Sequence, residues 1–168
     1  MNILLTIDRS PASDKAVRFV ADVFGRAGRD DLQVTLLHVA ESPPDELLFV
    51  TGDPSKQAQY RKLAEELEQS SRTEGERLLA EKQQALVASG LPSAAVHTKL
   101  IVRDCRPEAR KVVAALAIIE EMQHGPYDVI CLGRRGTGAA GAAMSSFPGS
   151  VAEKVLRAAP GKTVWVVD

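Results

Sequence analysis

Residues 127–136, YDVICLGRRG, followed by GSVAE at residues 149–153, form the stretch that decides the fold. The first six residues are a short apolar run that ends at glycine, a pattern that predicts a buried strand. Further on, Ser150 and Glu153 have the spacing of a capping box, which predicts that Ser150 caps a helix. We therefore expect a strand, a glycine-rich loop and a helix N-terminus in succession.

A loop of this composition is suited to an anion. Backbone N–H groups at a helix start point outward, the helix end carries partial positive charge, and glycine lets a ligand approach the backbone. The pattern is not a P-loop, because no Gly-x4-Gly-Lys-Ser/Thr motif is present. The simpler interpretation, that these glycines only turn the chain, stays open.

The rest of the chain alternates between strand and helix patterns. Strands are predicted at residues 2–8, 33–40, 95–102, 127–132 and 163–167, and helices at 11–24, 55–89, 107–123 and 150–159. The first helix has Ser10 as its expected N-cap, with Pro11 in the first helical position. This alternation predicts an α/β fold with a parallel sheet, and 168 residues suit a single domain, 1–168.

The helix at 55–89 has two apolar faces separated by a polar middle. The first comprises Tyr60, Leu63, Ala64 and Leu67, and the second comprises Leu78, Leu79 and Leu86. The middle, around Ser70, Ser71 and Gly75, predicts either a kink or a stretch that projects into solvent. In the preceding loop, 41–54, the apolar residues 47–50 either cover a cleft or simply pack.

Composition excludes several functional classes. The net charge is −1 and aromatic residues make up 4% of the chain, so neither a nucleic-acid surface nor a basic membrane patch is expected. No apolar run reaches the roughly 18 residues of a membrane span, and we expect a cytoplasmic protein. Cys131 is expected to be an inert core residue, Cys105 lies between arginines in a polar turn, and no metal site is predicted.

These motifs resemble the universal stress protein family over nearly the whole chain. The resemblance rests on the opening strand at 3–10, the second strand at 34–39, and the glycine pattern after residue 132. It implies a five-stranded parallel sheet, Rossmann-like and doubly wound, in strand order 3-2-1-4-5 with helices on both faces. Ligands of such sheets bind where the strand order reverses, here between strands 1 and 4, whose ends carry Asp8 and Gly133.

The resemblance also implies a site for an adenine nucleotide, ATP with or without Mg²⁺, with AMP and ADP as alternatives. The strand ends would meet adenosine, the first glycines would lie near ribose and phosphates, and the segment 149–151 would hold the phosphates. The implied binding residues are Thr6, Ile7, Asp8, Val39, Leu132, Gly133, Arg134, Gly136, Gly149, Ser150 and Val151. No positioned general base or catalytic lysine is apparent, so we assign no catalytic residue and expect slow hydrolysis at most.

Several of these assignments have a simpler alternative. Asp8 could only cap the first helical turn together with Ser10, and the arginines after Gly133 could be solvated loop charges. His38 is expected to be a satisfied strand residue rather than a catalyst. The loop at 137–148 is longer than in the family's ATP-binding members, so a stress protein that acts only through protein contacts is the alternative function.

The resemblance further implies a homodimer that forms through the last strand, with an unknown protein partner. The segment 163–167, TVWVV, suits a sheet edge that pairs with a second copy. Trp165 would either anchor that interface or pack inside the protein.

Overall fold

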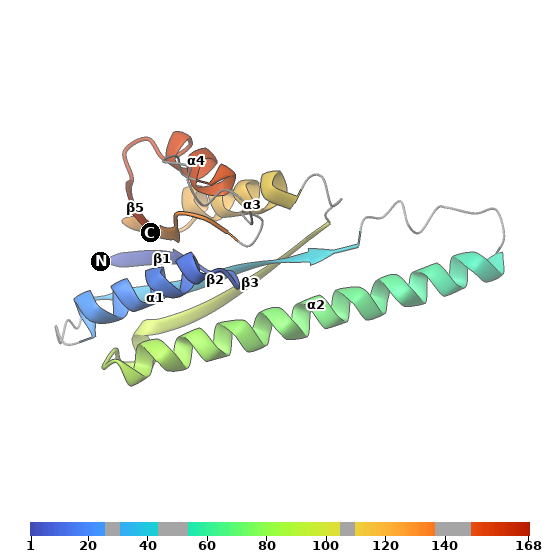
Figure 1. Cartoon of the computed structure of the whole chain (residues 1–168), viewed down its shortest axis with the longest axis horizontal. Coiled ribbons are helices and arrows are strands. Elements are labelled where there is room, and N and C mark those ends of the chain that lie inside the picture. The colour runs from blue at the N-terminus through green and yellow to red at the C-terminus, as the bar shows by residue number, and fades with distance from the viewer. Residues whose placement is uncertain (26–30, 44–53, 105–109, 137–148) are drawn as a thin grey trace.

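The five predicted strands form one sheet in the computed structural model, which describes residues 1–25, 31–43, 54–104, 110–136 and 149–168. All strands are parallel and their order is β3-β2-β1-β4-β5 (Figure 1), which confirms the predicted architecture. The strands are β1 (Asn2–Thr6), β2 (Gln33–Ser42), β3 (Val96–Asp104), β4 (Val129–Gly133) and β5 (Thr163–Val167).

Within the described ranges, four α-helices and one short 3₁₀ turn connect the strands. The helices are α1 (Pro11–Phe24), α2 (Pro54–Ala88), α3 (Arg110–His124) and α4 (Ser150–Arg157), and the turn η2 spans Ser93–Ala95. Helices α1 and α2 cover one face of the sheet, and α3 and α4 cover the other (Figure 1). Each face has its own apolar core: Ile3, Leu5 and Leu86 are fully buried in one, and Leu4, Ile130 and Val155 in the other.

The element bounds differ from the predicted ones mainly at strand ends. Strand β1 ends at Thr6 instead of residue 8, because the Asp8 N–H turns away and donates to Ser13 Oγ at 3.0 Å. Strands β2 and β3 run further than expected, since their pairing continues as far as Ser42 and Asp104. Periodicity cannot reveal such ends, because they depend on which partner each backbone group finds.

The predicted kink in α2 is wrong. The alternative, a polar middle that projects into solvent, is correct for Ser70, which is exposed, but not for Gly75. The helix is continuous over 35 residues, and Gly75 is buried at the point where it crosses the sheet. A Cβ at Gly75 would lie 2.7 Å from Leu100 Cδ1 and 2.9 Å from His38 Cδ2. The glycine therefore permits close packing, and the part of α2 that extends past the sheet is its N-terminal end (Figure 1).

Trp165 is half-buried and packs against α1 within the chain. Its ring lies edge-on to Phe19, with centroids 5.5 Å apart, and stacks on Phe24 at 6.0 Å. These contacts join β5 to α1. Aromatic pairs at such separations add to the free energy gained by burial alone, so Trp165 fixes the last strand against the first helix.

The buried thiol of Cys131 matches the prediction of an inert core cysteine. It lies within β4, and burial raises its pKa to about 12. Cys105 and residues 47–50 lie outside the described residues. Among the described residues, no helix is long and apolar enough to cross a membrane, and no group of side chains has the makings of a metal site.

Candidate functional site at the carboxyl ends of β1 and β4

The point where the strand order reverses lies between β1 and β4, as predicted. These two strands pair directly, with Leu5 opposite Cys131, and both then run into loops at the same edge of the sheet. The first loop leads to α1 and carries Asp8. The second begins at Gly133, and after it the chain returns to this edge at Gly149.

Asp8 is held in a tight turn before α1. Its Oδ1 accepts hydrogen bonds from the Ser10 N–H at 2.9 Å and the Ser10 hydroxyl at 2.5 Å. The Ser10 oxygen in turn accepts the Ser13 N–H at 3.1 Å, which confirms Ser10 as the N-cap of α1. The capping alternative for Asp8 is therefore correct for Oδ1, while the second carboxylate oxygen faces the glycine loop.

Gly136 lies against that second oxygen. A Cβ on Gly136 would be 2.8 Å from Asp8 Oδ2, so the loop after β4 passes directly beside the turn after β1. Gly133 makes a still closer approach to backbone, since its Cβ would be 2.7 Å from the Ala12 carbonyl carbon and 2.8 Å from Ser13 N. The start of α1 therefore packs on the end of β4.

Gly149 completes this arrangement from α4. Its N–H donates to the Arg134 carbonyl oxygen at 2.8 Å, and a Cβ there would lie 3.1 Å from the same oxygen. The start of α4 is thus fastened to the first residues of the glycine loop. Asp8, Gly136 and Gly149, which are far apart in sequence, meet at one place.

The capping box predicted at Ser150 is wrong. Helix α4 begins at Ser150 and its N-cap is Gly149, and no side chain within the described parts of the chain caps it. The Glu153 N–H bonds the Gly149 carbonyl oxygen at 2.9 Å, and the Glu153 carboxylate pairs with Arg157 at 2.6 Å instead of reaching back. The Ser150 hydroxyl is consequently not used to cap the helix.

Arg134 contacts Val167 through its backbone and Asp168 through its side chain. Its N–H donates to the Val167 carbonyl oxygen at 2.7 Å, and its guanidinium lies 2.5 Å from the Asp168 carboxylate. This ion pair lowers the pKa of Asp168. The Arg134 side chain is 22% exposed and pairs with a carboxylate, so it is only partly solvated.

The remaining predicted residues lie at the same edge but differ in what they can offer. Ile7 and Leu132 are buried in opposite cores, so only their backbone can meet a ligand. Thr6 and Val151 are half-buried. Val39 is half-buried on β2, beyond Leu37, the partner of Thr6 at the end of β1. The ends of β1 and β4 therefore bring Thr6, Ile7, Asp8, Leu132 and Gly133 to one edge, and the start of α4 adjoins this edge through Gly149.

A model of the universal stress protein family matches residues 1–168. The chain belongs to the universal stress protein family. Its fold is similar to that of hypothetical protein MJ0577, with 20% identity and a TM-score of 0.69 over 99% of this chain and 94% of that one. A search of curated proteins found no match.

Two further solved structures with this fold were determined with nucleotides. A universal stress protein in complex with cAMP has 14% identity and a TM-score of 0.56, covering 100% of this chain and 97% of that chain. An Arabidopsis thaliana universal stress protein family protein with AMP bound has 14% identity and a TM-score of 0.50, covering 100% and 92%. At these identities the likeness concerns the fold.

One residue near the site of this universal stress protein, Ser13, was not among the predicted residues. Its side chain is buried, and its hydroxyl accepts the Asp8 N–H. Its position three residues after the cap serine is the signal that could have found it. His38 Nδ1 lies 2.9 Å from the Ile7 carbonyl oxygen, which confirms a satisfied histidine.

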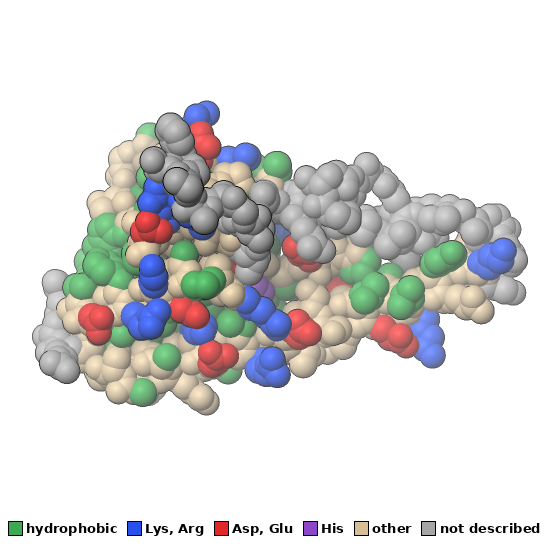
Figure 2. Space-filling view, in the orientation of Figure 1, with side chains coloured by type: hydrophobic (Ala, Val, Ile, Leu, Met, Phe, Trp, Pro, Cys, Tyr) green, Lys and Arg blue, Asp and Glu red, His purple; other side chains and the backbone are tan. Residues whose placement is uncertain are grey.

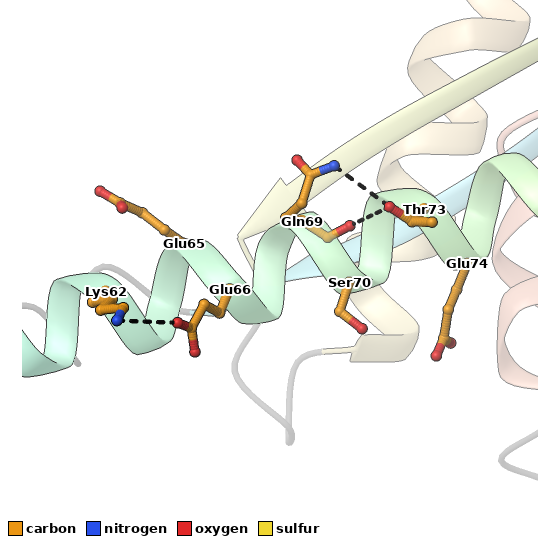
Figure 3. Close-up of a pocket in the computed structure, with 7 residues that line it drawn as sticks. All are labelled: Lys62, Glu65, Glu66, Gln69, Ser70, Thr73 and Glu74. Carbon is orange, nitrogen blue, oxygen red and sulfur yellow. Dashed lines mark hydrogen bonds and ion pairs between the residues drawn. The ribbon is translucent and has the colours of Figure 1, made fainter.

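A hollow on the surface lies elsewhere, on α2 (Figure 3). Among the residues that the structure describes, those that line it all belong to this helix: Lys62, Glu65, Glu66, Gln69, Ser70, Thr73 and Glu74. Several of these side chains interact within the helix: Lys62 pairs with Glu66 at 3.8 Å, and the Thr73 hydroxyl donates to the Gln69 carbonyl oxygen at 2.9 Å. A depression on one polar helix face lacks the convergent groups of the sheet edge, so it is not the candidate site of this universal stress protein.

Proposed function

We propose that this universal stress protein binds an adenine nucleotide, ATP with Mg²⁺ in the first place, at the carboxyl ends of β1 and β4. In this proposal it acts in the cytoplasm as a sensor or regulatory dimer and signals to a protein partner, with slow hydrolysis at most. The cAMP and AMP complexes of proteins with the same fold support an adenine nucleotide as the ligand class.

The observation that carries the proposal is the meeting of Asp8, Gly136 and Gly149. Three segments converge where the strand order reverses, and two of them arrive as glycine backbone. Helix α4 starts beside them without a side-chain cap, so its first N–H groups and the Ser150 hydroxyl suit a phosphate. A phosphate there would be held by dipoles and hydrogen bonds, without a lysine.

The packing also determines which groups of each site residue would contact the nucleotide, its backbone or its side chain. Because the Ile7 and Leu132 side chains belong to the cores, adenosine would be recognised by backbone groups and by the half-buried Thr6 and Val39. Asp8 Oδ2, next to Gly136, would accept a ribose hydroxyl. Arg134 stays with Asp168 and would contribute long-range charge only.

Ser150→Ala tests the phosphate site without disturbing the fold. Calorimetric titration of the nucleotide-free protein with ATP and Mg²⁺ should give a micromolar Kd, about −8 kcal/mol. Ser150→Ala should raise that Kd at least about 10-fold, since a hydrogen bond to a charged group is lost. The melting temperature of the free protein should not change, because the Ser150 side chain caps nothing.

Ser70→Ala on the exposed face of α2 is the matched control and should bind like the native chain. Parallel titrations with AMP and cAMP then rank the ligands. The absence of heat and of any thermal shift at millimolar concentrations of all three would refute nucleotide binding. The chain would then act through protein contacts alone.

We also infer that two copies pair through β5. This strand ends the sheet beside β4, and its segment from Val164 to Val167 is half-buried. A sheet edge of this kind can be extended by a second β5. The Trp165 ring is already packed on α1, so the strand itself, rather than this side chain, would form the contact.

A further inference from the structure

Helix α2 carries an apolar stripe in its N-terminal half, the end of which extends past the sheet. Tyr60, Leu63 and Leu67 are 37%, 50% and 48% exposed, and their spacing of three and four residues places them on one helix face. Figure 2 shows hydrophobic side chains along this part of the helix. Three large apolar side chains exposed on one face of a projecting helix are typical of a surface that binds another protein.

The stripe is distinct from the two other faces of α2. The face that packs on the sheet contains Gly75 and Leu78, and nearer the start of the helix Glu68 accepts a hydrogen bond from the Ser42 hydroxyl of β2 at 3.3 Å. At 3.6 residues per turn, the stripe lies about 90° to one side of that face. The outer face is the polar one in Figure 3, with its own contacts within the helix.

Charge is unevenly distributed along the same half of the helix. Residues 54–63 carry three basic side chains and no acidic one, whereas residues 64–74 carry four glutamates and one arginine. This order opposes the helix macrodipole, which favours acidic residues at the N-terminus, and no acidic side chain lies in the first turn. The macrodipole of α2 therefore does not account for the order of these charges, although Lys62 and Glu66 pair within the helix.

We propose that the stripe of one chain binds the same stripe of a second copy, with the two α2 helices antiparallel around a two-fold axis. In this register Leu63 of each copy faces Leu67 of the other, and Lys56 faces Glu74. A parallel arrangement would place basic segment against basic segment, so the charges select the antiparallel one. The Glu74 carboxylate already contacts Arg9 at 2.9 Å, yet its side chain is 58% exposed and accessible to a second cation.

The predicted assembly is concentration-dependent. Only three apolar side chains per copy are buried, and association has to offset the loss of translational and rotational freedom. The Lys56–Glu74 pairs lie at the surface, so added salt should weaken them, since the Debye length is about 8 Å at physiological ionic strength. Pairing through β5 involves another part of the molecule, so association through α2 and association through β5 can be measured separately.

Sedimentation equilibrium of the full-length chain, from micromolar to millimolar concentration, tests the proposal. The mass of the native chain at high concentration should be twice its mass at the lowest concentration. Leu63→Glu should abolish the doubling. The matched control is Leu116→Glu on α3, an equally exposed leucine at 53%, which should leave the doubling intact. Circular dichroism confirms that each variant is folded.

Charge reversal tests the register. Lys56→Glu and Glu74→Lys should each weaken the association at least about 10-fold, and the double variant should regain most of the native affinity. The proposal is overturned if the native chain keeps one mass at all concentrations. It is equally overturned if Leu63→Glu and Leu116→Glu behave alike, or if the double variant stays as weak as the single ones.

Discussion

The Tyr127 hydroxyl belongs to a chain of polar contacts that connects the start of β4 with α3 and β3. Tyr127 precedes β4 and donates to the Glu121 carboxylate of α3 at 2.7 Å, and Glu121 also pairs with Lys99 of β3 at 2.6 Å. Burial, together with the hydrogen bond to Glu121, raises the pKa of Tyr127 to about 12. Burial alone would raise the pKa of Glu121, but its bonds to Lys99 and Tyr127 lower it.

The raised pKa makes the contribution of Tyr127 to stability depend on alkaline pH. In the unfolded chain the phenol has a pKa of about 10, so its stabilising effect is complete below pH 10 and declines as pH rises toward 12. We expect Tyr127→Phe to be about 1 kcal/mol less stable than the native chain at pH 8. Urea unfolding should show this difference shrinking at pH 11, and a difference independent of pH would contradict the assignment.

The glycines of the site show what residue patterns can and cannot convey. The pattern after β4 correctly predicts a loop whose backbone is closely approached. At Gly133, however, the approaching atoms belong to Ala12 and Ser13 of α1. Sequence alone cannot distinguish a glycine that lets a ligand approach the backbone from one that lets a helix pack closely. Both situations require a residue without a side chain.

At the scale of the element, the two helix starts at the site are built differently. Helix α1 has a side-chain cap, in which Ser10 accepts the Ser13 N–H, while α4 starts at Gly149 without one. The sequence predicted a serine cap for both. It was right for Ser10, where proline follows in the first helical position, and wrong for Ser150, where Glu153 pairs with Arg157.

The difference predicts unequal effects of removing each serine. Ser10→Ala should lower the free energy of unfolding by about 1–2 kcal/mol, because the first turn of α1 loses its cap. Asp8 would also lose a hydrogen-bond donor. Ser150→Ala should change it by less than about 0.5 kcal/mol. Urea unfolding of both variants at neutral pH gives the comparison, and equal losses would mean that Ser150 caps α4 after all.

Helix α2 illustrates the limit of helix patterns. The sequence predicted its length to within a residue at each end, because a long run without internal proline favours one helix. Its glycine suggested a kink. The structure uses Gly75 to bring the helix backbone close to Leu100 and His38, a contact between segments that no local pattern contains.

At the scale of the whole molecule, β5 is one of the two edge strands of the sheet and the one through which we propose that two copies pair. Amide hydrogen exchange gives a direct test of the proposed pairing. In a single chain, alternate N–H groups of β5 point away from β4 and should exchange fast. With two copies paired through this strand, all five amides from Thr163 to Val167 should be protected.

The measurement compares dilute and concentrated protein, with the Leu63→Glu variant included so that contacts through α2 are absent. Protection of the outward amides should rise with concentration in both proteins. If these amides exchange fast at every concentration, the pairing proposed for β5 is wrong. The inward amides, which bond β4, serve as the internal reference.

The sequence by itself determined the order of strands and helices, the cap at Ser10 and the loop after β4, because periodicity, glycine and capping act over a few residues. The family resemblance added the strand order. Only the tertiary structure decided that Gly75 and Gly133 admit neighbouring elements, that Trp165 packs on α1, and that α2 extends past the sheet. These features depend on which distant segments meet, and that is settled by packing and hydrogen bonding across the whole chain.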